Sequence, residues 1–182
     1  MIEIVRAEQG DIPRILSIIA DAKAYMAEQG FSQWTEDYPD EQMFRLDIEL
    51  ERGFVIKLEQ NIVGVAALSY KQEEGYSTID GQWLSHQPYA VVHRMAISKE
   101  ARGTDAALRL LQSMELRCRV RGINSIRTDT HSLNKPMQGL LKKAGYSYCG
   151  VVTYPMEQIP TGDPTRLAYE KILTDGCACK GE

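Results

Sequence analysis

The stretch that decides the fold is Tyr89-Ala-Val-Val-His-Arg-Met-Ala-Ile97, followed by the turn Ser98-Lys-Glu-Ala-Arg-Gly-Thr-Asp-Ala-Ala107. The first segment is rich in β-branched and apolar residues and predicts a strand. From about 104 to 121, apolar residues recur at helical spacing and predict an amphipathic helix. A turn between a strand and a helix leaves backbone N–H groups free at the positive end of the helix dipole. The stretch therefore favours an anion-binding turn, although a plain turn before a capped helix has the same pattern.

The flanking sequence predicts an alternation of strands and helices. Further helices are expected from Ile12 to about Gly30 and at 133–144, each with an apolar face, and after Asp40. Strands are expected at 2–4, at 54–58 and 62–70 as a hairpin, and at 124–130, 146–154 and 166–173. The order contains no internal repeat and predicts a mixed α+β fold.

Length and composition indicate one domain. The 182 residues, 43% of them apolar, fit a single core over 1–173, with a flexible tail at 174–182. The net charge of −4 and the lack of a long basic run argue against a nucleic-acid partner. Without an apolar run of membrane-spanning length or a signal peptide, a cytoplasmic protein with no membrane partner is expected.

The four cysteines are expected to be reduced thiols. Cys177 and Cys179 have no second pair at zinc-site spacing, and only three histidines are available to complete a site. We therefore expect no metal, with a disulfide or metal in the tail as the weaker alternative.

Two motifs resemble the GNAT acetyltransferase family. The loop that begins at Arg102 follows an apolar strand end and is similar to the family's Gln/Arg-x-x-Gly-x-Gly/Ala loop. Asp129-Thr-His-Ser-Leu-Asn-Lys-Pro-Met137 and Lys143-Ala-Gly-Tyr146 resemble its fifth strand, the asparagine at the next helix start and the closing Gly-aromatic. The resemblance implies an α/β/α arrangement with about six or seven strands, mostly antiparallel, and about four helices. It also implies transfer of an acetyl group from acetyl-CoA.

The resemblance further implies which residues contact the cofactor. The pantetheine arm would pair with backbone groups of Met95, Ala96 and Ile97, like an added strand. The pyrophosphate would lie on the turn formed by Arg102, Gly103, Thr104, Asp105, Ala106 and Ala107. The later helix would contribute His131, Asn134, Met137 and Lys143. Asn134 has an equal alternative role, the capping of that helix.

Two positions depart from the family pattern. Asp105 replaces the first loop glycine and brings a negative charge near the expected phosphates, although Arg102 or Lys99 could offset it. Leu141 stands where many relatives have a tyrosine that protonates the leaving thiolate. These departures leave open an alternative to an enzyme: a module that binds acyl-CoA or a protein without turnover.

His93 is the candidate general base. An alkyl ammonium with a pKa of about 10 must lose a proton before it attacks a thioester directly in a ternary complex. An imidazole titrates near neutrality, and His93 lies on the strand expected to line the acetyl group. An equal alternative is that His93 is a core residue whose ring is hydrogen-bonded to the backbone. Backbone N–H groups from Met95 to Ile97 would stabilise the oxyanion.

The acceptor is expected to contact two aromatic and acidic segments. Trp34 and Tyr38 belong to the first, and Asp80 and Trp83 to the second. Aromatic faces and carboxylates attract a cationic amine. The expected partner is therefore a small-molecule or peptide amine. A homodimer contact or a lid packed on the core is an equal explanation for either tryptophan alone.

Overall fold

The computed structural model describes residues 1–155 and 163–173. One mixed sheet runs in the order β1-β2-β3-β5-β6-β8-β7-β4. The strands are β1 (Ile2–Arg6), β2 (Gly53–Leu58), β3 (Asn61–Ser69), β4 (Asp80–Gly81), β5 (Ala90–Ile97), β6 (Ser125–Thr130), β7 (Ser147–Thr153) and β8 (Thr165–Ile172). The helices are α1 (Ile12–Glu28), α2 (Glu41–Glu49), α3 (Ala106–Val120) and α4 (Lys135–Lys143), with short 3-10 turns η1 (Gln9–Asp11), η2 (Glu74–Thr78) and η3 (Lys99–Ala101).

The predicted fold class is confirmed, with one strand more than expected. All neighbouring strands pair antiparallel except β5 and β6. The additional strand is β4, which pairs with β7 at the sheet edge through Gly81 and Gly150. Both glycines have φ near 140°, and a Cβ on either would lie 2.2 Å from a carbonyl oxygen of the other strand. Such a short pairing between glycines has no apolar alternation that could reveal it in the sequence.

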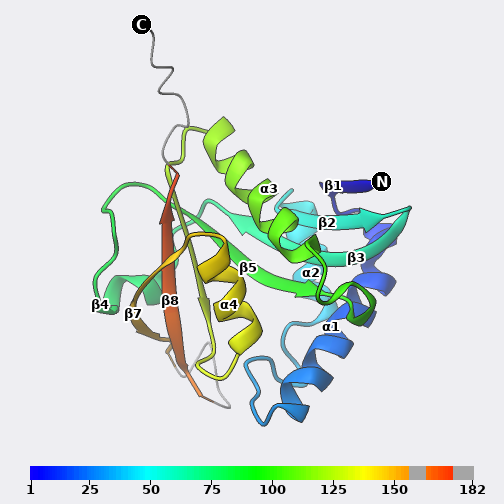
Figure 1. Ribbon diagram of the computed structural model, residues 1–182, viewed down its shortest axis with the longest axis horizontal. Helices are drawn as coiled ribbons and strands as arrows, with labels where there is room; N and C mark the ends of the chain where they lie inside the picture. Colours follow the sequence, from blue (N-terminus) through cyan, green and yellow to red (C-terminus); the bar gives the residue numbers. More distant parts are fainter. Residues whose placement is uncertain (156–162, 174–182) are drawn as a thin grey trace, which may run out of the picture.

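Helices cover both faces of the sheet in three layers (Figure 1). On one face, α3 and α4 bury Leu110 and Leu141 against side chains that include Phe54 and Ile56 of β2. Val55, between those two, points to the other face and packs with α1 and α2. This alternation along β2 follows from the two-residue period of a strand.

The ends of the chain add two observations. The predicted tail at 174–182, with Cys177 and Cys179, lies outside the described residues, whereas Cys118 and Cys149 are buried free thiols. Among residues 1–155 and 163–173, none of the helices combines the length and apolarity that crossing a bilayer requires.

The feature that positions the site is the divergence of β5 from β6. These parallel strands pair only at Ala90 and Val91, and from Val92 onward β5 has a strand partner on one side only, β3. Arg94 adopts a left-handed φ of 50°, where the register between β3 and β5 shifts, so β5 carries a β-bulge there. Figure 1 shows β2, β3 and β5 running across the picture while β8 stands nearly upright beside them. The bulge and the divergence leave a strand edge open inside the sheet.

Candidate active site

The open edge of β5 forms one wall of a cavity of about 1070 Å³. The cavity extends from the start of α3 and the inner side of α4, past β5, to α2 and the loop after α1. Most of the residues proposed from the sequence line this cavity. They are Trp34, Tyr38, His93, Met95, Ala96, Ile97, Arg102, Gly103, Thr104, Ala107, Asn134, Met137 and Lys143.

The turn before α3 presents unbonded N–H groups to this cavity. Thr104 stabilises the turn, because its Oγ1 donates to the Ala101 carbonyl at 2.7 Å and accepts from the Ala106 N–H at 3.3 Å. Gly103 takes a φ of 80°, and nothing lies within 4 Å of the place where its Cβ would be. Within the described residues, no acceptor is found for the N–H groups of Gly103, Asp105, Ala107 and Leu108. The turn can therefore donate several hydrogen bonds to one anion.

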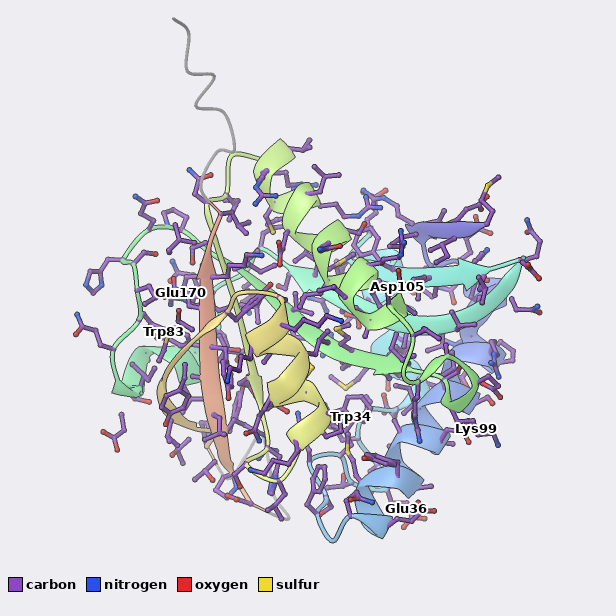
Figure 2. The ribbon with its side chains drawn as sticks, viewed as in Figure 1. Trp34, Glu36, Trp83, Lys99, Asp105 and Glu170 are labelled. Atoms are coloured by element: carbon purple, nitrogen blue, oxygen red, sulfur yellow. The ribbon has the colours of Figure 1, made fainter. Side chains whose placement is uncertain are left out.

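Asp105 does not occupy the space above this turn. Its φ of −83° suits any residue, so the position does not require glycine. Its carboxylate instead accepts from Arg109 Nε at 2.6 Å, one helical turn along α3, and the side chain is half-exposed. Figure 2 shows Asp105 at the start of α3. Arg109 offsets the charge, rather than the Arg102 or Lys99 considered from the sequence, and Arg102 lies over the Tyr25 ring at 4.7 Å.

Asn134 caps α4 and also faces the cavity. Its Oδ1 accepts from the Met137 N–H at 3.2 Å, which is the capping role considered as the alternative. Gln33, from the loop after α1, accepts from the His131 N–H at 3.0 Å and from Thr130 Oγ1 at 3.2 Å. This loop therefore bridges from α1 to the end of β6.

Several proposed site residues do not line the cavity. Ala106 is buried in the core, and the half-exposed Asp105 is turned along α3. The His131 ring stacks on Phe31 with centroids 5.0 Å apart. Asp80 forms the edge strand β4 and has an exposed side chain.

Trp83 has a structural role on the other half of the sheet. It is buried with Tyr76, and its indole N–H donates to the Tyr76 carbonyl at 2.9 Å. Arg127 lies 4.1 Å from its ring and pairs with the fully buried Glu170. Figure 2 places Trp83 beside Glu170 at β8, away from Trp34 near α4. The structure therefore does not bring Trp83 and Trp34 together at one site, and Trp83 takes the core packing considered as the alternative.

His93 lines the cavity but does not have the near-neutral pKa expected from the sequence. Burial, with the positive charges of Arg94 and Arg52 nearby, lowers the pKa of His93 to about 3. The imidazole is thus neutral at physiological pH. Its Nε2 lies 3.6 Å from Glu73 Oε2, a carboxylate that also lines the cavity.

Two carboxylates at this end of the cavity had no role assigned from the sequence. Burial and the nearby charge of Asp129 raise the pKa of Glu73. Asp129 Oδ2 accepts hydrogen bonds from the Tyr76 and Tyr154 hydroxyls, each at 2.7 Å, and burial raises its pKa. Glu73 lies in a link without periodicity, where the sequence carries no signal. Asp129 lies inside the motif that resembles the family's fifth strand, and that motif is the sequence feature that could have identified it as a site residue.

A third carboxylate, Asp47 of α2, holds the bulge of β5. Asp47 is 1% exposed and accepts two hydrogen bonds from Arg94, from Nε at 2.9 Å and from Nη2 at 2.8 Å. Arg52 Nε donates to the same carboxylate at 2.7 Å. Two cations on one buried carboxylate leave a net positive charge on this wall of the cavity. Within the described residues, no group of three or more His, Cys, Asp or Glu side chains is arranged to hold a metal.

Comparison with known proteins agrees with this geometry. A solved GNAT-family acetyltransferase from Streptococcus agalactiae 2603 is 34% identical, with a TM-score of 0.78 and 96% of each chain covered. An N-acetyltransferase of Bacillus subtilis named YesJ is 22% identical over 77% of this chain and 78% of the relative. A ribosomal-protein-alanine N-acetyltransferase from Brucella melitensis, 20% identical with a TM-score of 0.68 over 94% and 99% of the two chains, shares the fold. Residues 19–146 match the model of the Acetyltransferase (GNAT) family. The chain belongs to this family and is an acyltransferase.

Proposed function

We propose that the protein transfers an acetyl group from acetyl-CoA to a primary amine by direct attack in a ternary complex. One observation carries the proposal: the open edge of β5 and the free N–H groups before α3 line the same cavity as Glu73 and His93. The cavity therefore offers adjacent sites for an extended pantetheine arm and for its phosphates. Both sites are continuous with the polar end of the cavity, where Glu73 and His93 can accept a proton.

The donor fits the half of the cavity between α3 and α4. The backbone from Met95 to Ile97 has no strand on its β6 side, so it can pair with the amides of a pantetheine arm. The pyrophosphate would accept hydrogen bonds from the turn at 102–107, with the Lys143 ammonium as a further cation on the cavity wall. N–H groups of the bulged segment can donate to the thioester oxygen as negative charge develops there.

Glu73 is the proton acceptor that we propose for the attacking amine. A neutral imidazole with a pKa near 3 is a weaker base than a carboxylate whose pKa is raised. His93, 3.6 Å from Glu73, would orient the amine so that its proton passes to that carboxylate. Leu141 is a buried hydrocarbon side chain, and such a side chain has no proton to donate to the leaving thiolate. A thiol of pKa about 8.5 can leave as its anion.

Asp129 would bind the acceptor as its ammonium ion before deprotonation. One carboxylate oxygen is fixed by two tyrosine hydroxyls, and the residue lines the cavity. Trp34 and Tyr38 would cover the apolar part of the amine from the loop after α1. The Brucella melitensis fold neighbour is named for acetylating an alanine of a ribosomal protein. A peptide amine of that kind is one of the acceptor types expected here.

A calorimetric titration with acetyl-CoA tests the donor half of the proposal. Ala107→Glu places a carboxylate beside the expected pyrophosphate and should weaken binding at least about tenfold, or about 1.4 kcal/mol. Gln112→Glu adds the same charge on the exposed side of α3 and should leave the affinity unchanged. Equal affinities for the two variants would show that no phosphate lies at this turn.

A further inference from the structure

A second groove, of about 510 Å³, lies between α3 and the ends of β2 and β3. It carries five cationic side chains and one carboxylate, Glu51. The cations come from segments far apart in the chain: Arg6, Arg52, Lys71, Arg117 and Arg121. The chain as a whole has a net charge of −4, so this concentration of positive charge is local and selects for an anion.

Two arginines of the groove are paired with carboxylates, Arg6 with Glu51 at 3.1 Å and Arg52 with Asp47 at 2.7 Å. Among the described residues, Arg117 and Arg121 have no such ion pair and are held by other contacts. Arg117 lies over the Phe54 ring at 4.2 Å, and Arg121 lies over the Tyr70 ring at 4.5 Å. Arg117 Nη2 donates to the Ile4 carbonyl, while its buried Nε has no partner among the described residues. Burial and the charge of Arg6 lower the pKa of Arg117. An anion in the groove would relieve this repulsion between neighbouring cations.

The groove and the main cavity share a boundary. Arg52, Ser69 and Lys71 line both, and Glu73 follows two residues after Lys71. A molecule whose amine lies at Glu73 and that extends beyond Lys71 would therefore meet the groove. Leu116 and Val120, exposed on the α3 side, give the groove an apolar rim.

We propose that the groove binds acidic side chains of a peptide whose amine enters the cavity, so that the acceptor is an acidic peptide. That the peptide is the acetyl acceptor rests on the proposed function. That the groove binds acidic side chains rests on its positive charge and on its shared boundary with the cavity. The apolar rim suits a peptide better than a nucleic acid. The aromatic faces of Phe54 and Tyr70, which could stack with bases, are already covered by arginines.

Fluorescence anisotropy without cofactor tests whether the groove binds acidic side chains. The probe is a short peptide with a free N-terminal amine, a run of glutamates and a C-terminal dye, compared with a glutamine version. At low salt the glutamate peptide should bind about tenfold more tightly, and the difference should shrink as salt screens the charges. The double variant Arg117→Gln/Arg121→Gln should remove the preference. Arg119→Gln, exposed on α3 outside the groove, should keep it.

Three results would overturn the proposal. The first is equal binding of the two peptides, and the second is tighter binding of a single-stranded oligonucleotide than of the glutamate peptide. The third is a glutamate peptide that binds, in an enzyme that also binds acetyl-CoA, yet is acetylated no faster than the glutamine peptide. If acetyl-CoA itself does not bind, the proposed function fails, and the anisotropy result still decides whether the groove takes acidic peptides. Thermal unfolding of the double variant, compared with Arg119→Gln, separates lost binding from lost folding.

Discussion

At the scale of single residues, the site depends on which group at the polar end can hold a proton. Glu73 and His93 lie 3.6 Å apart. Their surroundings raise the pKa of Glu73 and lower the pKa of His93. Arginine charges and burial oppose a positive imidazolium, whereas burial and Asp129 oppose a negative Glu73. The proton of an incoming amine is therefore more stable on the carboxylate.

Replacing each group in turn distinguishes their roles. Glu73→Gln should lower kcat about 10²- to 10⁴-fold, the usual effect of losing a general base. His93→Gln should have a smaller effect, because it removes an orienting group. In the unmodified enzyme, kcat/KM should fall as pH decreases through the raised pKa of Glu73, since protonation removes the base. A larger loss in His93→Gln, or an inflection near pH 6.5 that this variant abolishes, would assign the base to His93.

Asp129 is predicted to favour function at the expense of stability. Its pKa is raised in the folded state, so the folded protein binds this proton more tightly than the unfolded chain does. The stability contributed by the proton is present at low pH and is lost as pH rises through the folded-state pKa. Asp129→Asn should therefore stabilise the protein at neutral pH by about 0.5–2 kcal/mol. It should also raise KM for a cationic amine about tenfold, since a counter-charge worth about 1.4 kcal/mol is lost.

Urea unfolding at two pH values checks this. The stability gain of Asp129→Asn should disappear below about pH 3.8, where the unfolded carboxyl is also protonated. A variant that is less stable than the parent at neutral pH would mean that the tyrosine hydrogen bonds to the carboxylate outweigh the cost of its burial.

At the scale of elements, α2 controls the shape of β5. Arg94 carries the left-handed bulge, and Asp47 of α2 holds its guanidinium by two hydrogen bonds. The bulge in turn opens the edge from Met95 to Ile97 that we propose for the donor. The pair is therefore a positioning device for the strand, since neither side chain is part of that edge.

Removing the carboxylate should disturb both stability and binding. Asp47→Asn leaves the buried guanidinium of Arg94 and the half-buried Arg52 without a counter-ion, and we expect a loss of about 3–5 kcal/mol in the free energy of unfolding. Glu41→Gln, in an exposed pair with Arg45 on the same helix, should change it by at most about 1 kcal/mol. Acetyl-CoA affinity should fall in Asp47→Asn and stay unchanged in Glu41→Gln. Unchanged affinity in both variants would show that the bulge does not depend on α2.

The elements also show how far the sequence alone could be interpreted. Apolar periodicity predicted the helices and the longer strands, because each buries a regular face. The anion turn at 102–107 was expected from the order strand, turn and helix, and the edge at 95–97 from the family resemblance, because both segments are contiguous in the chain. The pairing of Gly81 with Gly150 depends on close backbone approach, which leaves no such pattern. The sequence left two interpretations of Trp83 open, because an aromatic side chain in a loop suits a binding site and a core equally well.

At the scale of the whole molecule, distant segments meet in ways that no local pattern indicates. The sequence has no long basic run, yet five cations from four separate segments line one groove. Glu73, Asp129 and Asp47 likewise come from a loop, a strand and a helix, and converge only through the order of the sheet. Such sites are properties of the topology, so they require the structure.

The two halves of the sheet share a hydrophobic core under α3 and α4, but only two strand residues, Ala90 and Val91, pair across the junction. Beyond the short parallel pair at the start of β5, the loop after α1 bridges them through Gln33, which bonds to the end of β6 and accepts from Arg166 of β8 through its carbonyl. A donor lying between β5 and β6 would contact both halves. The structure therefore predicts that acetyl-CoA and Gln33 stabilise the same junction.

Thermal unfolding with and without acetyl-CoA tests this prediction. Gln33→Ala leaves the His131 N–H and the Thr130 hydroxyl without an acceptor and should lower stability by about 1–3 kcal/mol. Acetyl-CoA at one hundred times its dissociation constant should add about 2.7 kcal/mol to the unmodified protein. In Gln33→Ala the affinity for acetyl-CoA should be weaker, because binding must also order the junction. The control Gln112→Ala, on the exposed side of α3, should match the parent in both stability and acetyl-CoA affinity. A Gln33→Ala variant with reduced stability and undiminished affinity would mean that the donor site forms within one half of the sheet, and that the loop after α1 serves the fold alone.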